Sequence, residues 1–215
     1  EGFNGNGEGR RLMEKRTLSP RQLERNFRLG VADGAFWRIW YVLTDPTVVL
    51  TWFLGMLTSS PVIAGLATPI REIGAMVPQL LVAGPTQRMP YRLRMYRITA
   101  AIRACAWILI IFAVFVIGPR RPTLLLVAFL VLYSIKMIGM GMSIPAWMDV
   151  VAGAVPAHRR GAWASARDVI GGVLGIVATL AAQFVLDEKH GVRFPYNFGV
   201  LFVLAGIPLM AAYLS

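Results

Sequence analysis

The chain has 215 residues, of which 56% are hydrophobic and 15% are charged. A soluble domain carries roughly a quarter charged residues, and its apolar residues recur at helical or strand spacing, whereas here they form long continuous blocks. This composition excludes a water-soluble domain and predicts an all-α integral membrane protein, because a helix satisfies its own backbone groups in hydrocarbon.

The formal net charge is +11, and the Lys and Arg residues lie mainly in the gaps between apolar blocks. Membrane orientation explains this distribution better than a nucleic-acid partner does, so we expect no nucleic acid to bind. Cys105 is the one cysteine, and His158 and His190 lie in different loops, so we expect no disulfide, metal site or cofactor. The sequence contains no recognisable catalytic motif, and we predict that the protein is not an enzyme and has no catalytic residues.

Residues 1–33 are glycine-rich and then basic, which predicts a cytoplasmic tail. Ser19-Pro20 is a typical helix start, so this tail is predicted to contain an amphipathic helix on the membrane surface, with a solvated tail as the alternative. No cleavable signal peptide precedes the first apolar block, which we expect to act as the insertion signal. Residue 1 is Glu and an apolar block runs almost to Ser215, so we expect the sequence to be part of a longer polypeptide.

Six apolar blocks follow, each long enough to cross a hydrocarbon core of ~30 Å, which takes ~20 helical residues. The predicted spans are residues 35–57, 62–84, 98–117, 124–151, 162–186 and 195–214. Asp45-Pro46 interrupts the first span, and Pro69 and Pro78 lie within the second.

Orientation follows from the positive residues. Fourteen Lys and Arg residues lie in the tail and in loops 85–97 and 156–167, whereas four lie in the loops on the opposite side. Because cytoplasmic loops carry the excess of Lys and Arg, we predict a multi-pass protein with a cytoplasmic amino terminus.

Four charged residues are predicted to meet near mid-bilayer: Asp45, Arg71, Glu72 and Lys136. Ionisable groups are costly there and usually serve a site, so these residues are candidates for substrate binding or ion coupling. The alternative is that Arg71–Glu72 and Asp45–Lys136 are internal ion pairs that only fix the packing.

A second group of charges lies near the cytoplasmic ends of the spans, and it predicts a latch that closes this side. The residues of this predicted cytoplasmic gate are Arg88, Arg92, Asp149, Arg160 and Arg167. The alternative is a solvated Asp149 with arginines that only anchor the topology.

Gly171 and Gly175 share one face of the fifth span at i, i+4 spacing. Small residues in this pattern let helices approach closely, which predicts helix packing either within one bundle or against a second one.

The six spans, the basic loop between the second and third, and the stretch Val155-Pro156-Ala157-His158-Arg159-Arg160-Gly161 resemble the amino-terminal half of a major facilitator superfamily transporter. Five short motifs are similar to an uncharacterised bacterial branch of that superfamily: Leu57-Thr58-Ser59-Ser60, Val77-Pro78-Gln79-Leu80, Pro145-Ala146-Trp147-Met148-Asp149, Arg160-Gly161 and Phe194-Pro195-Tyr196-Asn197-Phe198. The loop Gly84-Pro85-Thr86-Gln87-Arg88-Met89-Pro90 lacks the Asp and the second Gly of the superfamily motif, and the fifth span lacks the Gly-Pro pair of the antiporters.

The resemblance implies six transmembrane helices that form one half of a major-facilitator-type bundle in a bacterial inner membrane. It implies that the first and fourth spans face a central cavity with Asp45 and Lys136, and that the second and fifth spans meet a second six-helix half, on the same chain or another copy. The expected function is alternating-access transport of a small solute, coupled to a proton or ion gradient. The alternative is a non-transporting scaffold or assembly subunit that binds other membrane subunits within the bilayer.

Overall fold

The computed structural model describes residues 19–88, 92–187, 189 and 192–214, and their side chains except at 83–93 and 212–214. The first helix, α2 (Pro20–Leu43), begins with a capping box in which the Ser19 hydroxyl accepts from the Gln22 backbone and the Gln22 side chain accepts from the Ser19 backbone. The helix continues for 24 residues, so the predicted surface helix and the start of the predicted first span are one element. The chain from Pro20 to Leu43 contains no internal proline to interrupt it.

The chain does not merely kink at Asp45-Pro46: α2 ends at Leu43, just before these residues. The Asp45 carboxylate accepts from the backbone N–H of Thr47 at 2.9 Å and of Val48 at 3.0 Å, which closes a turn. The predicted span 35–57 therefore consists of the end of α2 and a separate short helix, α3 (Val49–Gly55). After α3 come α4 (Pro61–Ala64), which packs against it, and α5 (Ala67–Arg88).

The rest of the chain forms α6 (Arg92–Val116), α7 (Pro122–Ala154), the 3₁₀ turn η1 (Ala157–Arg159), α8 (Arg160–Leu186) and α9 (Tyr196–Leu214). The described residues thus form eight α-helices and no strand, which confirms the predicted all-α class.

Three segments of the described chain are long and apolar enough to cross a bilayer: Arg94–Val116, Pro122–Ala154 and Ala157–Leu186. Tyr196–Ala211 is apolar but shorter. These helices indicate a multi-pass membrane protein with three candidate spans, fewer than the six predicted. The amino-terminal half of α2 carries charged and polar side chains, which is why this helix does not count among the candidates.

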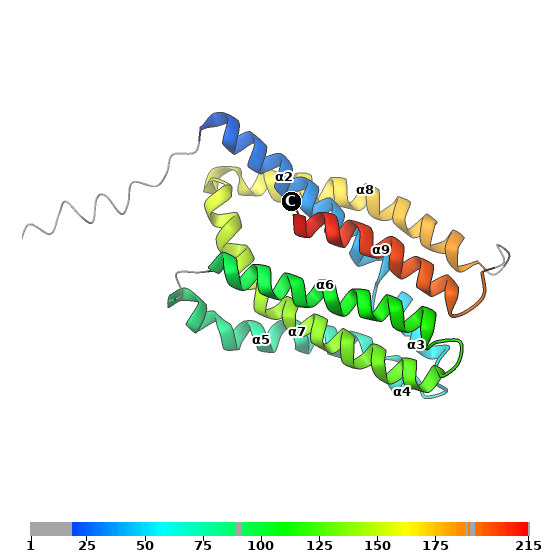
Figure 1. Cartoon of the computed structure of the whole chain (residues 1–215). Helices are drawn as coiled ribbons and strands as arrows, with labels where there is room; N and C mark the ends of the chain where they lie inside the picture. Colours follow the sequence, from blue (N-terminus) through cyan, green and yellow to red (C-terminus); the bar gives the residue numbers. More distant parts are fainter. Residues whose placement is uncertain (1–18, 89–91, 188, 190–191, 215) are drawn as a thin grey trace, which may run out of the picture.

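The helices pack in a repeated pattern. In Figure 1, α2, α8 and α9 lie on one side of the bundle and α5, α6 and α7 on the other, with α6 beside α9 between them. One unit of three helices consists of α2, α5 and α6, and the next consists of α7, α8 and α9. The first helix of each unit packs on the last two helices of the other: α2 packs on α8 and α9, and α7 packs on α5 and α6. The two three-helix units of the chain therefore make equivalent contacts.

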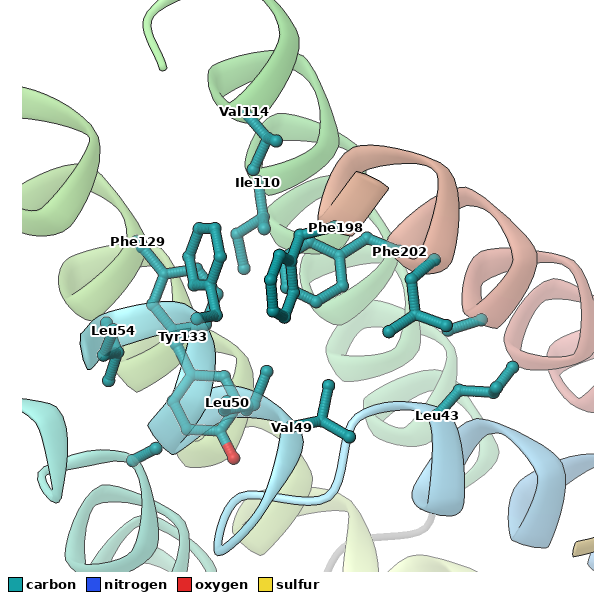
Figure 2. Close-up of a cluster of buried hydrophobic side chains, with 14 of the residues drawn as sticks. Leu43, Val49, Leu50, Leu54, Ile110, Val114, Phe129, Tyr133, Phe198 and Phe202 are labelled. Atoms are coloured by element: carbon teal, nitrogen blue, oxygen red, sulfur yellow. The ribbon is translucent and has the colours of Figure 1, made fainter. Parts of the chain in front are cut away.

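An aromatic core joins the two sides of the bundle, as the close-up in Figure 2 shows. Phe53 of α3 is fully buried, with its ring centroid 5.0 Å from that of Phe129 in α7 and 5.2 Å from that of Phe202 in α9. Trp107 of α6 packs on the same Phe202 at 5.3 Å and donates its indole N–H to the Phe202 carbonyl at 3.1 Å. The short helix α3 is thus anchored by its aromatic side chain.

Candidate functional site

Lys136 lies near the middle of α7 and is completely buried. Its ammonium nitrogen lies 3.6 Å from the ring centroid of Trp40 and 5.2 Å from that of Trp107. Within the described part of the chain, this nitrogen has no hydrogen-bond partner. Two indole faces offset part of the cost of burying a charge, because the ring quadrupole attracts a cation.

No ion pair joins Asp45 to Lys136 in the described part of the chain, whereas Asp45, Arg71 and Glu72 all lie close enough to the Tyr133 side chain to interact with it electrostatically. The structure thus brings three of the four predicted charges to one region and places Lys136 against two tryptophan rings instead. The Asp45 carboxylate is held in its own turn, where Oδ1 accepts from Thr47 and Val48. The break after α2 directs this carboxylate to backbone N–H groups, which is the ordinary role of Asp at such a turn.

Arg71 and Glu72 are sequence neighbours on α5 and also form an ion pair. Arg71 Nε lies 3.6 Å from Glu72 Oε1, and Arg71 Nη1 donates to the Tyr41 hydroxyl at 2.7 Å. The Glu72 side chain is 56% exposed on the bundle surface. Lys136, by contrast, points into the interior of this bundle, whereas the resemblance implied that it faces a cavity shared with a second half.

A cavity of about 300 Å³ lies between α2, α6, α7 and α8. Its walls combine charged, aromatic and aliphatic side chains: Asp33, Trp37, Tyr96, Arg103, Met140, Ser143, Ile144, Trp147 and Arg167. Pockets that bind small molecules are mostly apolar with a few placed polar groups, and this cavity has that composition.

An ion pair forms one wall of the cavity. Arg167 Nη2 lies 3.5 Å from Asp33 Oδ2, and both side chains are about one-fifth exposed, at 18% and 21%. The Arg167 guanidinium also lies 4.9 Å from the ring centroid of Trp147 and 5.3 Å from that of Trp163. A methyl group at Gly34 would overlap the Arg167 side chain, so this glycine makes room for the arginine between α2 and α8.

Arg103 provides a second guanidinium from α6 and is 4% exposed. Its Nη1 donates to the Ser143 hydroxyl at 3.0 Å, and its guanidinium lies 5.6 Å from the ring centroid of Trp37. The Ser143 hydroxyl in turn donates to the Met140 carbonyl at 2.8 Å. Side chain and backbone thus hold Arg103 in a defined orientation.

Lys136 lies one helical turn from the cavity along α7, on the side away from the amino-terminal end of the bundle. On α7, Lys136 precedes Met140 by four residues, and on α6, Trp107 follows Arg103 by four. On α2, Trp37 and Trp40 are three residues apart, with ring centroids at 4.7 Å. Residues at these spacings share one helix face, so the cavity and the tryptophan cage of Lys136 are stacked along the same three helices.

The structure shows the contacts of two of the predicted gate residues, Arg160 and Arg167. Arg167 belongs to the cavity wall. Arg160 donates from Nε to the Val155 carbonyl at 3.1 Å and from Nη2 to the Ala152 carbonyl at 3.0 Å, which caps the end of α7.

Asp149 is exposed near the end of α7, and the side chains of Arg88 and Arg92 lie outside the part of the chain that the structure describes.

The glycine pair of α8 packs inside the bundle. A methyl group at Gly171 would lie 3.0 Å from the Cβ of Arg38, and one at Gly175 would lie 3.4 Å from Val42 Cγ2. Both glycines therefore lie against α2, within the bundle rather than on its outer surface.

Sequence reasoning did not assign Asp33, Trp37, Tyr96 or Arg103 to a site. Arg103 could have been identified as a candidate site residue, because it is an arginine within an apolar block. Asp33 falls within the predicted tail, because the polar first half of α2 does not indicate a continuous helix.

Comparisons of the chain with protein-family models, with curated proteins and with solved structures find no match. No group of three or more His, Cys, Asp or Glu side chains suited to a metal ion occurs in the described part. The functional assignment therefore rests on the cavity and on the buried lysine beneath it.

Proposed function

We propose that the chain forms one six-span half of a secondary transporter that moves a small solute by alternating access. The observation that carries this proposal is the cavity, with its ion pair, second arginine and indole rings, inside a bundle that contains three long apolar candidate spans. Charged groups at such positions are costly in a membrane, and they mark substrate or ion pathways.

Three further helices would complete the six spans. Helices α2, α5 and α9 have 24, 22 and 19 residues, and at ~1.5 Å per residue they reach roughly 36, 33 and 28 Å, close to the thickness of a hydrocarbon core. We place the amino terminus in the cytoplasm of a bacterial cell and the bundle in its inner membrane, because the basic loops lie on the amino-terminal side.

Lys136 is the group we assign to ion coupling. A charge on this side chain faces two indole rings and the like charge of the Arg103 guanidinium. A solute that changes the field around Arg103 therefore changes the free energy of placing a proton on Lys136. Protonation and solute binding would then be linked, as coupled transport requires.

The repeated contacts of the two three-helix units agree with this proposal, because transporters are commonly built from structural repeats. The resemblance to a half of a major facilitator superfamily transporter adds a second six-helix half as the partner, on the same chain or in another copy. In that arrangement the bilayer and the second half cover the outward side chains of α5 and α8.

A non-transporting scaffold is the second candidate, and one observation favours it. Helix α8 exposes a long apolar face that includes Val169, Val173, Ile176, Leu180 and Phe184. Large exposed apolar surfaces mark interaction sites, and a scaffold would use this face to bind another membrane subunit.

Transport can be tested with the full polypeptide that contains these residues, reconstituted in proteoliposomes on a solid-supported membrane. Under a pH gradient, at least one of a panel of organic anions, cations and neutral solutes should evoke a transient current. Lys136→Met should abolish that current, whereas Arg120→Gln, on an exposed turn far from the cavity, should preserve it. If no solute evokes a current and the Lys136 variant lowers only the yield of a native complex, the scaffold is the correct function.

A further inference from the structure

The charges that line the cavity indicate what it binds. Among its described lining residues, two are guanidiniums, Arg103 and Arg167, and one is a carboxylate, Asp33. We propose that the cavity binds a small organic monoanion, a carboxylate attached to a flat apolar body. This inference rests on the proposed solute site and specifies its ligand.

The two arginines form the carboxylate end of the proposed site. They come from different helices, α6 and α8, and both contribute to the wall of the same cavity. A guanidinium presents a planar fork of N–H donors that matches a carboxylate, and such charge-assisted pairs are stronger than neutral hydrogen bonds. Ser143 orients Arg103, and Asp33 with the tryptophan rings orients Arg167, so neither side chain must be ordered by the ligand.

The remaining walls suit a flat apolar body. They consist of the rings of Trp37, Trp147 and Tyr96 with the aliphatic side chains of Met140 and Ile144. Aromatic rings favour offset or edge-to-face contacts with another ring. A volume of about 300 Å³ is at the lower end of the range of ligand pockets, which limits the body to about one ring.

The charge balance disfavours other solutes. A cation would meet two guanidiniums. Asp33 is already paired with Arg167, and the Trp37 and Trp147 rings already face the guanidiniums of Arg103 and Arg167. Lys136, one helical turn from the cavity, adds positive potential whenever it is protonated. A neutral ring adds no charge to offset the two guanidiniums in a poorly solvated cavity, whereas a monoanion does.

Three probes of similar shape separate these cases: benzoate, benzyl alcohol and benzylamine. The full polypeptide is purified in detergent, and its intrinsic tryptophan fluorescence is titrated with each probe, since Trp37 and Trp147 line the cavity. We expect saturable quenching by benzoate and none by the alcohol or the amine.

Matched variants connect this binding to the cavity. Arg103→Gln and Arg167→Gln should each weaken benzoate binding by roughly 10- to 100-fold, the range expected for loss of a charge-assisted hydrogen bond. Asp33→Asn should tighten it, because the ligand then no longer competes for Arg167. Arg120→Gln should change nothing. A gain of affinity in the Asp33 variant cannot result from misfolding.

Stronger binding of benzylamine than of benzoate would overturn the proposed ligand class, as would benzoate binding that the Arg103, Arg167 and Asp33 variants leave unchanged. The absence of quenching by all three probes would overturn it as well. These results can be told apart from a failure of transport. A current evoked by a cation or a neutral solute would support the transporter but contradict the anionic ligand. Specific benzoate binding without any current would support the binding site but contradict transport.

Discussion

Lys136 is the residue whose environment departs furthest from ordinary protein chemistry. A buried ammonium is usually paired with a carboxylate or bonded to carbonyl groups. Here the ammonium nitrogen lies over two indole faces, the nearer at 3.6 Å, and has no hydrogen-bond partner in the described part of the chain. Such a position lowers stability, and we interpret it as the coupling group of the proposed transporter.

Replacement of Lys136 by Met should therefore leave the unfolding temperature in detergent unchanged or raise it, because an apolar side chain of similar volume removes the cost of burying a charge. Trp40→Ala should lower the free energy of unfolding by about 3–5 kcal/mol, since it empties a packed site. Thermal unfolding followed by circular dichroism measures both. A larger loss of stability for Lys136→Met than for Trp40→Ala would contradict the view that this lysine is retained for function.

Asp45 offers a second test at the same scale. Asp45→Asn keeps an oxygen that can accept from Thr47 and Val48, whereas Asp45→Ala removes it. We expect Asp45→Ala to cost about 0.5–2 kcal/mol, the usual range for loss of a side-chain cap, and Asp45→Asn to cost much less. Equal unfolding temperatures for the two variants would show that the carboxylate does not stabilise the turn, and loss of transport in Asp45→Asn would return this residue to ion coupling.

Helices α5 and α7 cross closely at a pair of glycines, Gly74 and Gly141. A methyl group at Gly141 would lie 2.5 Å from the Gly74 carbonyl oxygen and 2.6 Å from that of Ala75. Both contacts are with backbone atoms, so a flexible side chain cannot relieve the overlap by rotating. The crossing therefore depends on glycine at this point of α7.

Gly141→Ala should separate α5 from α7 and destabilise the protein, with a cost of about 1–3 kcal/mol for overpacking. Gly153→Ala is the matched control, because it lies in the same helix and a methyl group there meets nothing within 4 Å. The control should be neutral or slightly stabilising, since alanine is the better helix former by about 1 kcal/mol. Chemical or thermal unfolding of both variants provides the comparison, and equal stabilities would show that the crossing is looser than described.

Much of the helical architecture could be predicted from the sequence, because long apolar blocks and helix-breaking residues are local signals. The termination near Asp45-Pro46 and the helices of the apolar blocks are examples. The length of α2 could not be predicted, since its first half has no apolar periodicity and its helical course depends on packing of Val31 with Val155 and Trp163. Length and hydropathy together select three candidate spans, whereas apolar blocks alone predicted six.

The candidate site was harder to predict than the helices. Lys136 stood out as a charge in an apolar block, but its tryptophan neighbours come from helices far apart in the sequence. Asp33 and Arg167 are separated by more than 130 residues and meet only because α2 packs on α8. Sequence spacing identified which charges are unusual, whereas the packing of α2, α6, α7 and α8 determined which of them lie together.

For the whole molecule, the proposed orientation makes a direct prediction about two turns. In a Cys105→Ala background, His158→Cys lies on η1 at the amino-terminal end of the bundle and Arg120→Cys lies at the opposite end. A membrane-impermeant maleimide added to intact spheroplasts should label the residue 120 variant, and the residue 158 variant should be labelled only after permeabilisation. The reverse pattern would place the amino terminus outside the cytoplasm.

In the proposed transporter, the cavity of the bundle is a solute site that opens to each side of the membrane in turn. Met140 lines that cavity, so Met140→Cys in the Cys105→Ala background reports on its access to water. We predict that an impermeant thiol reagent modifies this cysteine when it is applied from either side of reconstituted vesicles, and that benzoate slows the reaction from both. A cysteine that is unreactive from both sides would mean that the cavity is a sealed packing defect of a scaffold, and would contradict the transport function.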